Sequence, residues 1–407
     1  MQIRCSNEQC HAAVDRMFSG YECPSCGDLL EISYEPLGLS PEELKRVWLE
    51  RRLSSERVDR SGVWRFRELL PSYAPCDVVT MQEGNTPVLE GRLSADHAGL
   101  ARLRFKHLGW NPTACFKDLG MTVAVTEAKH RGVRIVACAS TGNTAGSMAA
   151  FAARAGITAR VYLPKGKVSR AKLAQALDYG AEIVEIDGNF DDALSTLTQH
   201  RDEEVYFLNS INPFRIEGQK TAVFELMEQL GWNPPDYIVL PAGNLGNTSA
   251  FGKALRELFD AGMLTKIPHL VSVQASGANA FVRTFHEGGE SLHVVSQPST
   301  RATAICIGAP RSWRKATKAI RFTQGFVLDV PDDEILAAKR TIGRDGIGCE
   351  PASAATLAGI RRLVAAGRIH PGANVVAILT GHVLKDTDPI APTASTDHTR
   401  TPVYAAN

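Results

Sequence analysis

The chain has 407 residues, of which 44% are hydrophobic and 22% charged, and its formal net charge is +1. Such a chain can bury a large core and is expected to form two or three domains. Its near-zero charge gives no indication of a nucleic-acid partner or a membrane surface. No secretion signal or stretch of membrane-helix length is evident. These features favour a cytoplasmic enzyme that acts on a small molecule.

Four of the nine cysteines cluster near the N-terminus. They form a C-x4-C pair and a C-x2-C pair, and are Cys5, Cys10, Cys23 and Cys26. Two such pairs are typical of one tetrahedral zinc site, and four thiolates leave no open position for substrate. The spacing predicts a structural zinc ribbon over residues 1–35, with His11 as an alternative ligand. A ribbon with four reduced cysteines and no metal is the competing interpretation.

The next segment contains helix and turn signals. Ser40-Pro41-Glu42-Glu43 is a capping box with proline at the first helical position, which predicts a helix toward Arg52. A short element is expected from Trp64 to Leu70, before a turn-rich loop at Glu83-Gly84-Asn85-Thr86-Pro87 and a strand over Ala101–Phe105.

Apolar runs of strand length then alternate with segments that suit helices. The expected strands are Ile135–Ala139, Val161–Leu163, Ile183–Ile186, Val205–Leu208, Tyr237–Leu240, Leu270–Val273 and Val375–Leu379. The expected helices include Thr248–Asp260, Asp332–Arg344 and Pro351–Ala366. Such alternation is typical of parallel sheets with crossover helices, so the fold class is α/β.

A turn at residues 111–120 brings Lys117 to the start of a helix predicted over Asp118–Lys129, with Gly132 as its stop signal. The positive end of a helix dipole disfavours an ammonium group, so the pKa of this lysine is expected to be lowered. A lysine of that kind suits Schiff-base chemistry. The alternative is a solvated lysine that happens to begin a helix.

Two polar loops follow predicted parallel strands, where open α/β sheets bind their ligands. Ser140-Thr141-Gly142-Asn143-Thr144 follows one strand, and Gly243-Asn244-Leu245-Gly246-Asn247 follows another. Glycines and a helix N-terminus favour phosphate binding in the second loop. Neither loop matches a dinucleotide fingerprint or a nucleoside-triphosphate loop.

Together these segments resemble the threonine synthases, a family of fold type II pyridoxal-phosphate enzymes, and the likeness extends from the cysteine ribbon to Asp386. It rests on Asn111-Pro112-Thr113, Phe116-Lys117-Asp118, both polar loops, Asn209-Ser210-Ile211-Asn212-Pro213, Arg215, Glu217-Gly218-Gln219-Lys220, Cys349-Glu350-Pro351-Ala352-Ser353-Ala354-Ala355 and Leu379-Thr380-Gly381-His382. The resemblance implies two parallel-sheet α/β domains besides the ribbon, and a homodimer.

The resemblance also implies roles for individual residues. Lys117 would form the internal aldimine of pyridoxal 5'-phosphate, Asn143 would bond the phenolic oxygen, and Thr380 would face the pyridine nitrogen. The cofactor phosphate would lie on Gly243, Asn244, Leu245, Gly246 and Asn247. A neutral hydroxyl at the ring nitrogen makes a weaker electron sink than a carboxylate, which favours elimination and replacement over transamination.

By the same resemblance, Asn209, Ser210 and Arg215 would bind a substrate phosphate. The implied reaction converts O-phospho-L-homoserine and water into L-threonine and phosphate. Arg215 precedes a helix expected to begin near Glu217, and a structural clamp on that carboxylate is the alternative role for it.

One departure from the family lies beside the lysine. Ala114-Cys115 and Leu119 stand where family members commonly have Gly-Ser and Arg. The difference leaves open an enzyme that replaces the phosphate of O-phospho-L-serine, as in cysteate synthase. Cys115 is expected to be a packed side chain rather than a redox-sensitive thiol. A partner-binding ribbon on an inactive enzyme body is disfavoured by the scarcity of basic residues.

The expected domain organisation has four parts. Residues 1–35 form the ribbon, 36–95 with 213–386 the large cofactor-binding domain, 96–212 a smaller α/β domain, and 387–407 a mobile tail with too few apolar residues to pack.

Overall fold

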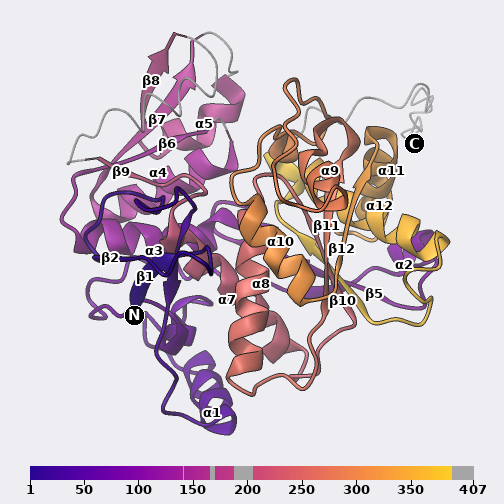
Figure 1. Ribbon diagram of the computed structural model, residues 1–407, viewed down its shortest axis with the longest axis horizontal. Coiled ribbons are helices and arrows are strands. Elements are labelled where there is room, and N and C mark those ends of the chain that lie inside the picture. Colours follow the sequence, from indigo (N-terminus) through magenta and orange to yellow (C-terminus); the bar gives the residue numbers. More distant parts are fainter. Residues whose placement is uncertain (141, 166–169, 188–204, 387–407) are drawn as a thin grey trace, which may run out of the picture.

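The computed structural model describes residues 1–140, 142–165, 170–187 and 205–386. Thr141 and the predicted tail at 387–407 lie outside these ranges. The described residues form a three-stranded, a six-stranded and a four-stranded sheet (Figure 1). Across the same residues, no helix is both long and apolar enough to cross a membrane.

The N-terminal sheet is the ribbon predicted from the cysteines. Its antiparallel order is β2-β1-β3, with β1 at Gln2–Cys5, β2 at Ala13–Val14 and β3 at Leu30–Ser33. Helix α1 (Pro41–Arg52) follows, and the reciprocal Ser40 and Glu43 bonds of the predicted capping box are present. A 3-10 helix, η1, covers Trp64–Leu69.

The six-stranded sheet has the order β12-β11-β10-β13-β5-β4 and is parallel except for its edge strand β4. Its strands are β4 (Val88–Glu90), β5 (Leu103–His107), β10 (Tyr237–Pro241), β11 (His269–Ala275), β12 (Phe326–Val330) and β13 (Val375–Leu379). The associated helices are α2 (Arg92–Ala98), α7 (Pro213–Gln229), α8 (Gly246–Asp260), α9 (Ala280–His286), α10 (Trp313–Phe322), α11 (Asp332–Arg344) and α12 (Pro351–Ala365).

The four-stranded sheet is parallel throughout, with the order β8-β7-β6-β9. Its strands are β6 (Ile135–Ala139), β7 (Thr158–Pro164), β8 (Glu182–Ile186) and β9 (Val205–Phe207). Helices α3 (Lys117–His130), α4 (Asn143–Ala155) and α5 (Arg170–Asp178) accompany it. This sheet lies beside the larger one, at the upper left of Figure 1.

Two sequence-based expectations need correction. Helix α7 begins at Pro213, capped by the Asn212 side chain, and not near Glu217, so Arg215 lies in its first turn. Strand β5, which falls within the range 96–212, pairs with β13 and β4 in the six-stranded sheet. We therefore propose to begin the smaller domain after β5.

Helices α3 and α7 meet backbone to backbone at two glycines. A Cβ on Gly218 would lie 1.8 Å from the carbonyl oxygen of Leu119, and one on Gly120 would lie 2.9 Å from that of Arg215. Only glycine permits this approach. The contact brings the first turn of α3, with Lys117, against the first turn of α7, with Arg215.

Candidate active site

The lysine turn is attached to the segment that follows β13. The Phe116 N–H donates to the Thr380 carbonyl at 2.9 Å, and the His382 N–H donates to the Ala114 carbonyl at 3.0 Å. On its other side, the Asp118 carboxylate accepts hydrogen bonds from the Thr113 N–H at 2.7 Å and from the Ser147 hydroxyl at 2.5 Å. The amine of Lys117 is thus carried on a turn held by the segment after β13 and by α4.

The environment of Lys117 differs from that of two other lysines, Lys106 and Lys220. Burial, reinforced by the charge of Arg215, lowers the pKa of Lys117 to about 7. The predicted direction is therefore matched, although burial rather than the helix dipole is the leading cause. Lys106 and Lys220 form buried ion pairs with Glu225 and Glu217. Among the described residues, the Lys117 amine has no hydrogen-bond or carboxylate partner and lies 4.0 Å from the Phe116 ring centroid.

Asn143 and Thr380 meet at one buried carboxylate, that of Glu350. Glu350 Oε2 accepts a hydrogen bond from Asn143 Nδ2 at 2.9 Å, and Oε1 accepts one from the Thr380 hydroxyl at 2.9 Å. Asn143 begins α4 and Glu350 precedes α12, so the contact joins the two parallel-sheet units. Sequence reasoning assigned no role to Glu350, although an acid just before Pro351 and a helix start was visible in the motif.

The loop from Gly243 to Asn247 has the features of an anion cradle. Leu245 adopts a left-handed φ of 65° at the start of α8. Within the described chain, no backbone N–H from Gly243 to Asn247 donates to a loop or side-chain acceptor, and both polar atoms of the buried Asn247 amide are unpartnered. Unpaired donors at a helix N-terminus fit a phosphate group.

Arg215 is buried at 1% exposure and carries unused donors. Its Nη1 donates to the Leu208 carbonyl at 3.0 Å, whereas Nε and Nη2 have no partner among the described residues. Glu217 is bonded instead by the Tyr34 hydroxyl at 2.7 Å and by Lys253 at 3.4 Å, so a clamp between Arg215 and Glu217 is not seen. Burial lowers the pKa of Arg215 to about 10, which leaves it cationic at neutral pH.

Asn209 and Ser210, the two other residues expected to bind a substrate phosphate, already have hydrogen-bond partners in the protein. Both amide atoms of Asn209 bond the backbone of Ala139, at 3.3 and 3.2 Å, and thereby tie β9 to the end of β6. The Ser210 hydroxyl accepts from Asn244 Nδ2 at 2.7 Å, and its own proton has no acceptor within the described part of the chain. Ser210 thus connects this segment to the anion cradle.

The structure shows the surroundings of the three residues beside Lys117 that depart from the family pattern. Ala114 has a φ of 63°, a left-handed conformation that glycine adopts without strain. Cys115 is fully buried, and burial raises its pKa to about 11, so it is a packed thiol in this structure. Leu119 is likewise buried, with its carbonyl against Gly218.

The four ribbon cysteines lie together with their sulfur atoms all within 4.8 Å of one another. Cys5 and Cys26 are 3.4 Å apart and Cys10 and Cys23 are 3.6 Å apart. Four sulfurs on one tetrahedral zinc would be separated by about 3.8 Å, given a zinc–sulfur bond of about 2.3 Å. The donor set and spacing fit that metal, and His11 is not part of the cluster.

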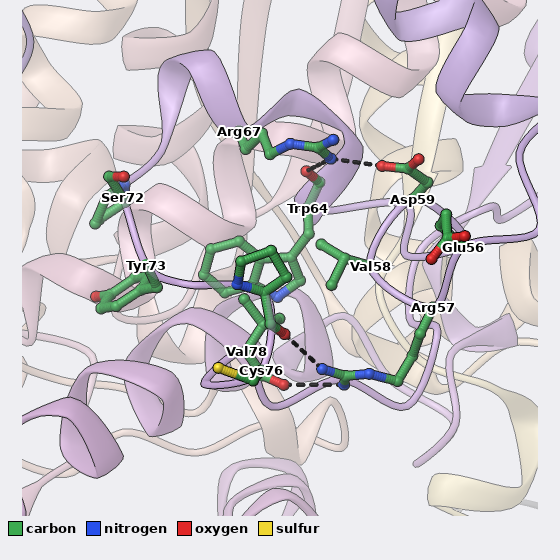
Figure 2. A pocket seen from close by; sticks show the side chains of 12 residues that line it. Glu56, Arg57, Val58, Asp59, Trp64, Arg67, Ser72, Tyr73, Cys76 and Val78 are labelled. Atoms are coloured by element: carbon green, nitrogen blue, oxygen red, sulfur yellow. Dashed lines mark hydrogen bonds and ion pairs between the residues drawn. The ribbon is translucent and has the colours of Figure 1, made fainter.

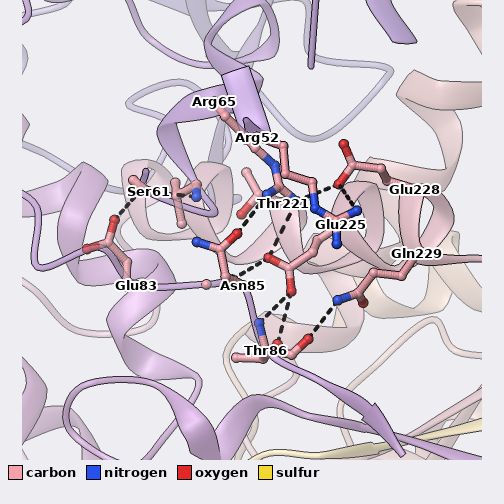
Figure 3. A network of polar contacts seen from close by, with 12 residues as sticks. Arg52, Ser61, Arg65, Glu83, Asn85, Thr86, Thr221, Glu225, Glu228 and Gln229 are labelled. Carbon is pink, nitrogen blue, oxygen red and sulfur yellow. Dashed lines mark hydrogen bonds and ion pairs between the residues drawn. The ribbon is translucent and has the colours of Figure 1, made fainter. Parts of the chain in front are cut away.

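Two further regions lie outside this site. A cavity of about 430 Å³ opens beside Trp64 and Tyr73, and none of the cofactor or substrate candidates lines it (Figure 2). Around Glu225, a buried network holds the loop that contains Asn85 and Thr86 (Figure 3). That loop in turn reaches the lysine turn, because the Gly84 N–H donates to Asn111 Oδ1 at 2.8 Å.

The comparisons with known proteins agree with this geometry. A family model described as "Pyridoxal-phosphate dependent enzyme" matches residues 79–381, so the chain is a pyridoxal-phosphate-dependent enzyme. It is 44% identical to a threonine synthase of Methanocaldococcus jannaschii over 90% of this chain and 89% of the relative. It is also 44% identical to a threonine synthase of Methanosarcina acetivorans over 93% and 91%. Within its class, the chain belongs to the threonine synthase family.

Solved structures show the same fold at lower identity. The threonine synthase of Escherichia coli superposes with a TM-score of 0.68 at 19% identity, over 95% of this chain and 90% of that one. Maize serine racemase gives a TM-score of 0.65 at 20% identity, over 75% and 89%. The fold type II architecture predicted from the sequence is confirmed.

Proposed function

We propose that the chain is a threonine synthase that converts O-phospho-L-homoserine and water into L-threonine and phosphate by γ-elimination and β-replacement. The observation that carries this proposal is the buried Arg215, whose Nε and Nη2 lack partners within the described residues, beside a lysine whose pKa it helps to lower. A buried guanidinium without a carboxylate is costly unless an anion completes it. A substrate phosphate supplies that anion.

Pyridoxal 5'-phosphate, when bound, supplies an electron sink for carbanion chemistry. Lys117 would hold it covalently, the free N–H groups from Gly243 to Asn247 would bind its phosphate, and Asn143 and Thr380 would meet its ring. The unpartnered Asn247 amide and the left-handed Leu245 support this arrangement.

Residues of the chain would bind the substrate phosphate, position the binding segment and transfer protons. Arg215 offers two charge-assisted bonds to the leaving phosphate, and Ser210 offers a hydroxyl from the segment joined to the cofactor loop. Asn209 positions this segment through Ala139. The amine of Lys117, with its pKa of about 7, can both accept and release protons near neutral pH.

We further propose a structural zinc on Cys5, Cys10, Cys23 and Cys26, and a homodimeric assembly. The mutual distances of the sulfurs support the zinc. The homodimer rests on the family resemblance alone.

A product assay tests the proposal. The purified holoenzyme is supplied with O-phospho-L-homoserine or with O-phospho-L-serine, and amino-acid products and phosphate are measured. Threonine from the first substrate, at a much higher kcat/KM, supports the proposal. Preference for O-phospho-L-serine would instead support a replacement enzyme of the cysteate synthase type, which the Ala114-Cys115 departure leaves open.

A further inference from the structure

The N-terminal ribbon contacts the segment from the end of β9 to the start of α7 (Figure 1). This segment, residues 207–212, contains Asn209 and Ser210, and we call it the phosphate segment. Strand β9 is the last in the order β8-β7-β6-β9 and pairs with β6 within the described part of the chain. An edge strand presents backbone groups that need partners from outside its sheet.

Phe207 is the residue of β9 whose backbone groups point away from the sheet. The Leu208 N–H donates to the Ala137 carbonyl in β6 at 2.8 Å, and successive residues of a strand bond in opposite directions. The Phe207 carbonyl accepts from Asn212 Nδ2 at 2.9 Å, and the Phe207 N–H donates to the Tyr21 hydroxyl at 2.9 Å. The ribbon therefore supplies the outer partner of this N–H group.

Tyr21 is fixed by the part of the ribbon that carries the cysteine cluster. Its carbonyl accepts from the Leu30 N–H in β3 at 3.0 Å, and the Cys23 N–H donates to the Asp28 carbonyl at 2.6 Å. The Tyr21 ring is buried, and its centroid lies 6.1 Å from that of Tyr206. The phenol oxygen is thus held at a defined position beside β9.

A second contact connects the ribbon to both ends of the phosphate segment. Arg131, at the end of α3, donates hydrogen bonds to the ribbon carbonyls of Arg16 and Phe18. Its guanidinium carbon lies 5.1 Å from the Tyr206 ring centroid and 5.6 Å from the Phe214 ring centroid, within the range of a cation–π attraction. Tyr206 precedes the phosphate segment and Phe214 follows it, so the segment is bracketed.

The proposed phosphate-binding residues share this backbone, whereas the cofactor lysine does not. The Leu208 carbonyl, next to Phe207, accepts from Arg215 Nη1 at 3.0 Å, and Asn209 follows directly. A displacement of Phe207 would therefore be passed to Arg215 and Asn209. Lys117 lies on a turn bonded to the segment after β13 and to α4, and is supported separately.

We propose that Tyr21 is a positioning residue, which holds the phosphate segment where Asn209, Ser210 and Arg215 can bind the substrate phosphate together. This inference rests on the proposed function, since it takes these three residues to bind that phosphate. It gives the ribbon a role in substrate binding besides the folding energy that a structural metal supplies. The ribbon acts through the backbone of β9 and does not itself touch the substrate.

The test compares Tyr21→Phe with the wild-type holoenzyme. The substitution keeps the ring and removes the hydroxyl, which leaves the Phe207 N–H without its partner. Inorganic phosphate is the binding probe, measured as a competitive inhibitor against O-phospho-L-homoserine, and KM and kcat are taken from the same assays. We expect Ki for phosphate and KM to rise by roughly tenfold. The change in kcat should be much smaller, and the cofactor absorbance should be unchanged.

Tyr73→Phe is the matched control. It also removes a hydrogen-bonded phenol hydroxyl, but that hydroxyl donates to Glu127 of α3 at 2.6 Å and has no bond to the phosphate segment. Its Ki and KM should stay close to the wild-type values. An equal rise of Ki and KM in Tyr21→Phe and Tyr73→Phe would overturn the inference, because any lost buried hydroxyl would then have the same effect.

Two further outcomes separate the inference from the proposed function. Wild-type Ki and KM in folded, cofactor-loaded Tyr21→Phe would overturn the inference, and the proposed function would stand as long as the wild type forms threonine. A loss of cofactor absorbance and kcat in step with phosphate affinity would also overturn it, since Tyr21 would then only maintain the fold. Failure of the wild type to form threonine from O-phospho-L-homoserine would instead contradict the proposed function.

Discussion

The network around Glu225 and the candidate active site are both buried and polar, yet their polar groups are satisfied differently. Glu225 accepts from the Asn85 N–H at 2.6 Å and the Thr86 N–H at 2.8 Å (Figure 3). It also pairs with Lys106. Arg215 has two guanidinium nitrogens without partners in the described residues, and Asn247 has two such amide atoms. A group that stays unpartnered inside a folded chain costs about 1–3 kcal/mol. The Glu225 network also has unpartnered atoms, Arg65 Nε and Glu228 Oε1, but Arg65 is paired there with carboxylates, whereas Arg215 has no carboxylate partner among the described residues.

The difference separates two kinds of buried charge. The Glu225 network stabilises the fold and holds the loop that supports Asn111 in the lysine turn. The charges at the strand ends reduce stability in the empty protein and gain their partners from cofactor and substrate. Substitutions should therefore lower stability in one region and activity in the other.

The largest effect is expected for Lys117→Ala, which removes the covalent attachment and the proton-transferring amine. We expect kcat to fall by roughly 10³-fold or more. Borohydride reduction of the wild-type holoenzyme followed by peptide mapping should place the pyridoxyl group on Lys117. Recovery of the label on Lys106 or Lys220 would refute the assignment.

The pH dependence of cofactor capture follows from the same lysine. Burial lowers the pKa of Lys117 to about 7, so the reactive neutral amine should predominate above that pH. The rate of cofactor attachment to the apoprotein should rise with pH and level off somewhat above pH 7, as measured by stopped-flow absorbance. A rate that keeps rising toward the ordinary lysine pKa would contradict the lowered value.

Glu225→Ala should break the ion-pair network and leave Lys106 buried without its counter-ion. Loss of one partner of a buried pair costs about 3–5 kcal/mol of unfolding free energy, which urea denaturation would measure. Glu90→Ala is the matched control, because Glu90 and Arg102 form an ion pair with both side chains 62% exposed. That exposed pair should contribute less than about 1 kcal/mol. Equal losses in the two variants would remove the distinction.

Arg215→Ala should show the opposite pattern. We expect kcat/KM for the phosphorylated substrate to fall by roughly 100-fold, because two charge-assisted bonds to the phosphate are lost. The cofactor absorbance should persist, and the unfolding free energy of the apoprotein should be unchanged or higher, since an incompletely paired buried charge is gone. Arg215→Lys should restore activity only in part. Wild-type kcat/KM in Arg215→Ala would exclude this residue from the substrate site.

The smallest effect is expected at the strained turn. Ala114 has a φ of 63°, so Ala114→Gly should relieve left-handed strain and raise the unfolding free energy by about 1 kcal/mol. Thermal unfolding of the apoprotein measures the gain. Ala124→Gly, in the middle of α3, is the control and should be destabilising by about 1 kcal/mol. A loss of stability in Ala114→Gly would show that the turn carries no such strain.

The sequence predicted the elements that local patterns determine. Strands β6 and β13 agree residue for residue because both are continuous apolar runs. Strand β12 was missed, since Asp329 interrupts the apolar run at Phe326–Val330. Lys117 and the two polar loops could be predicted because each is part of a motif of contiguous residues.

The remaining parts of the site depend on contacts between distant residues. Glu350 meets Asn143 across 207 positions of the sequence, and no local pattern reports that bond. The same holds for the free donors of Arg215, which depend on Glu217 bonding to Tyr34 and Lys253 instead. The turn at Ala114 combines a local bond, from its own N–H to the Asn111 carbonyl, with a distant one that the sequence does not report, from the His382 N–H to the Ala114 carbonyl.

The glycine contact between α3 and α7 limits how this enzyme can vary. Since the carbonyl of Leu119 meets Gly218 with no side chain between them, main-chain geometry sets the spacing of the two helices. Exchanges of apolar residues elsewhere on α3 or α7 can alter packing without moving Lys117 relative to Arg215. Any side chain at Gly120 or Gly218 would instead force the two helices apart and move Lys117 away from Arg215.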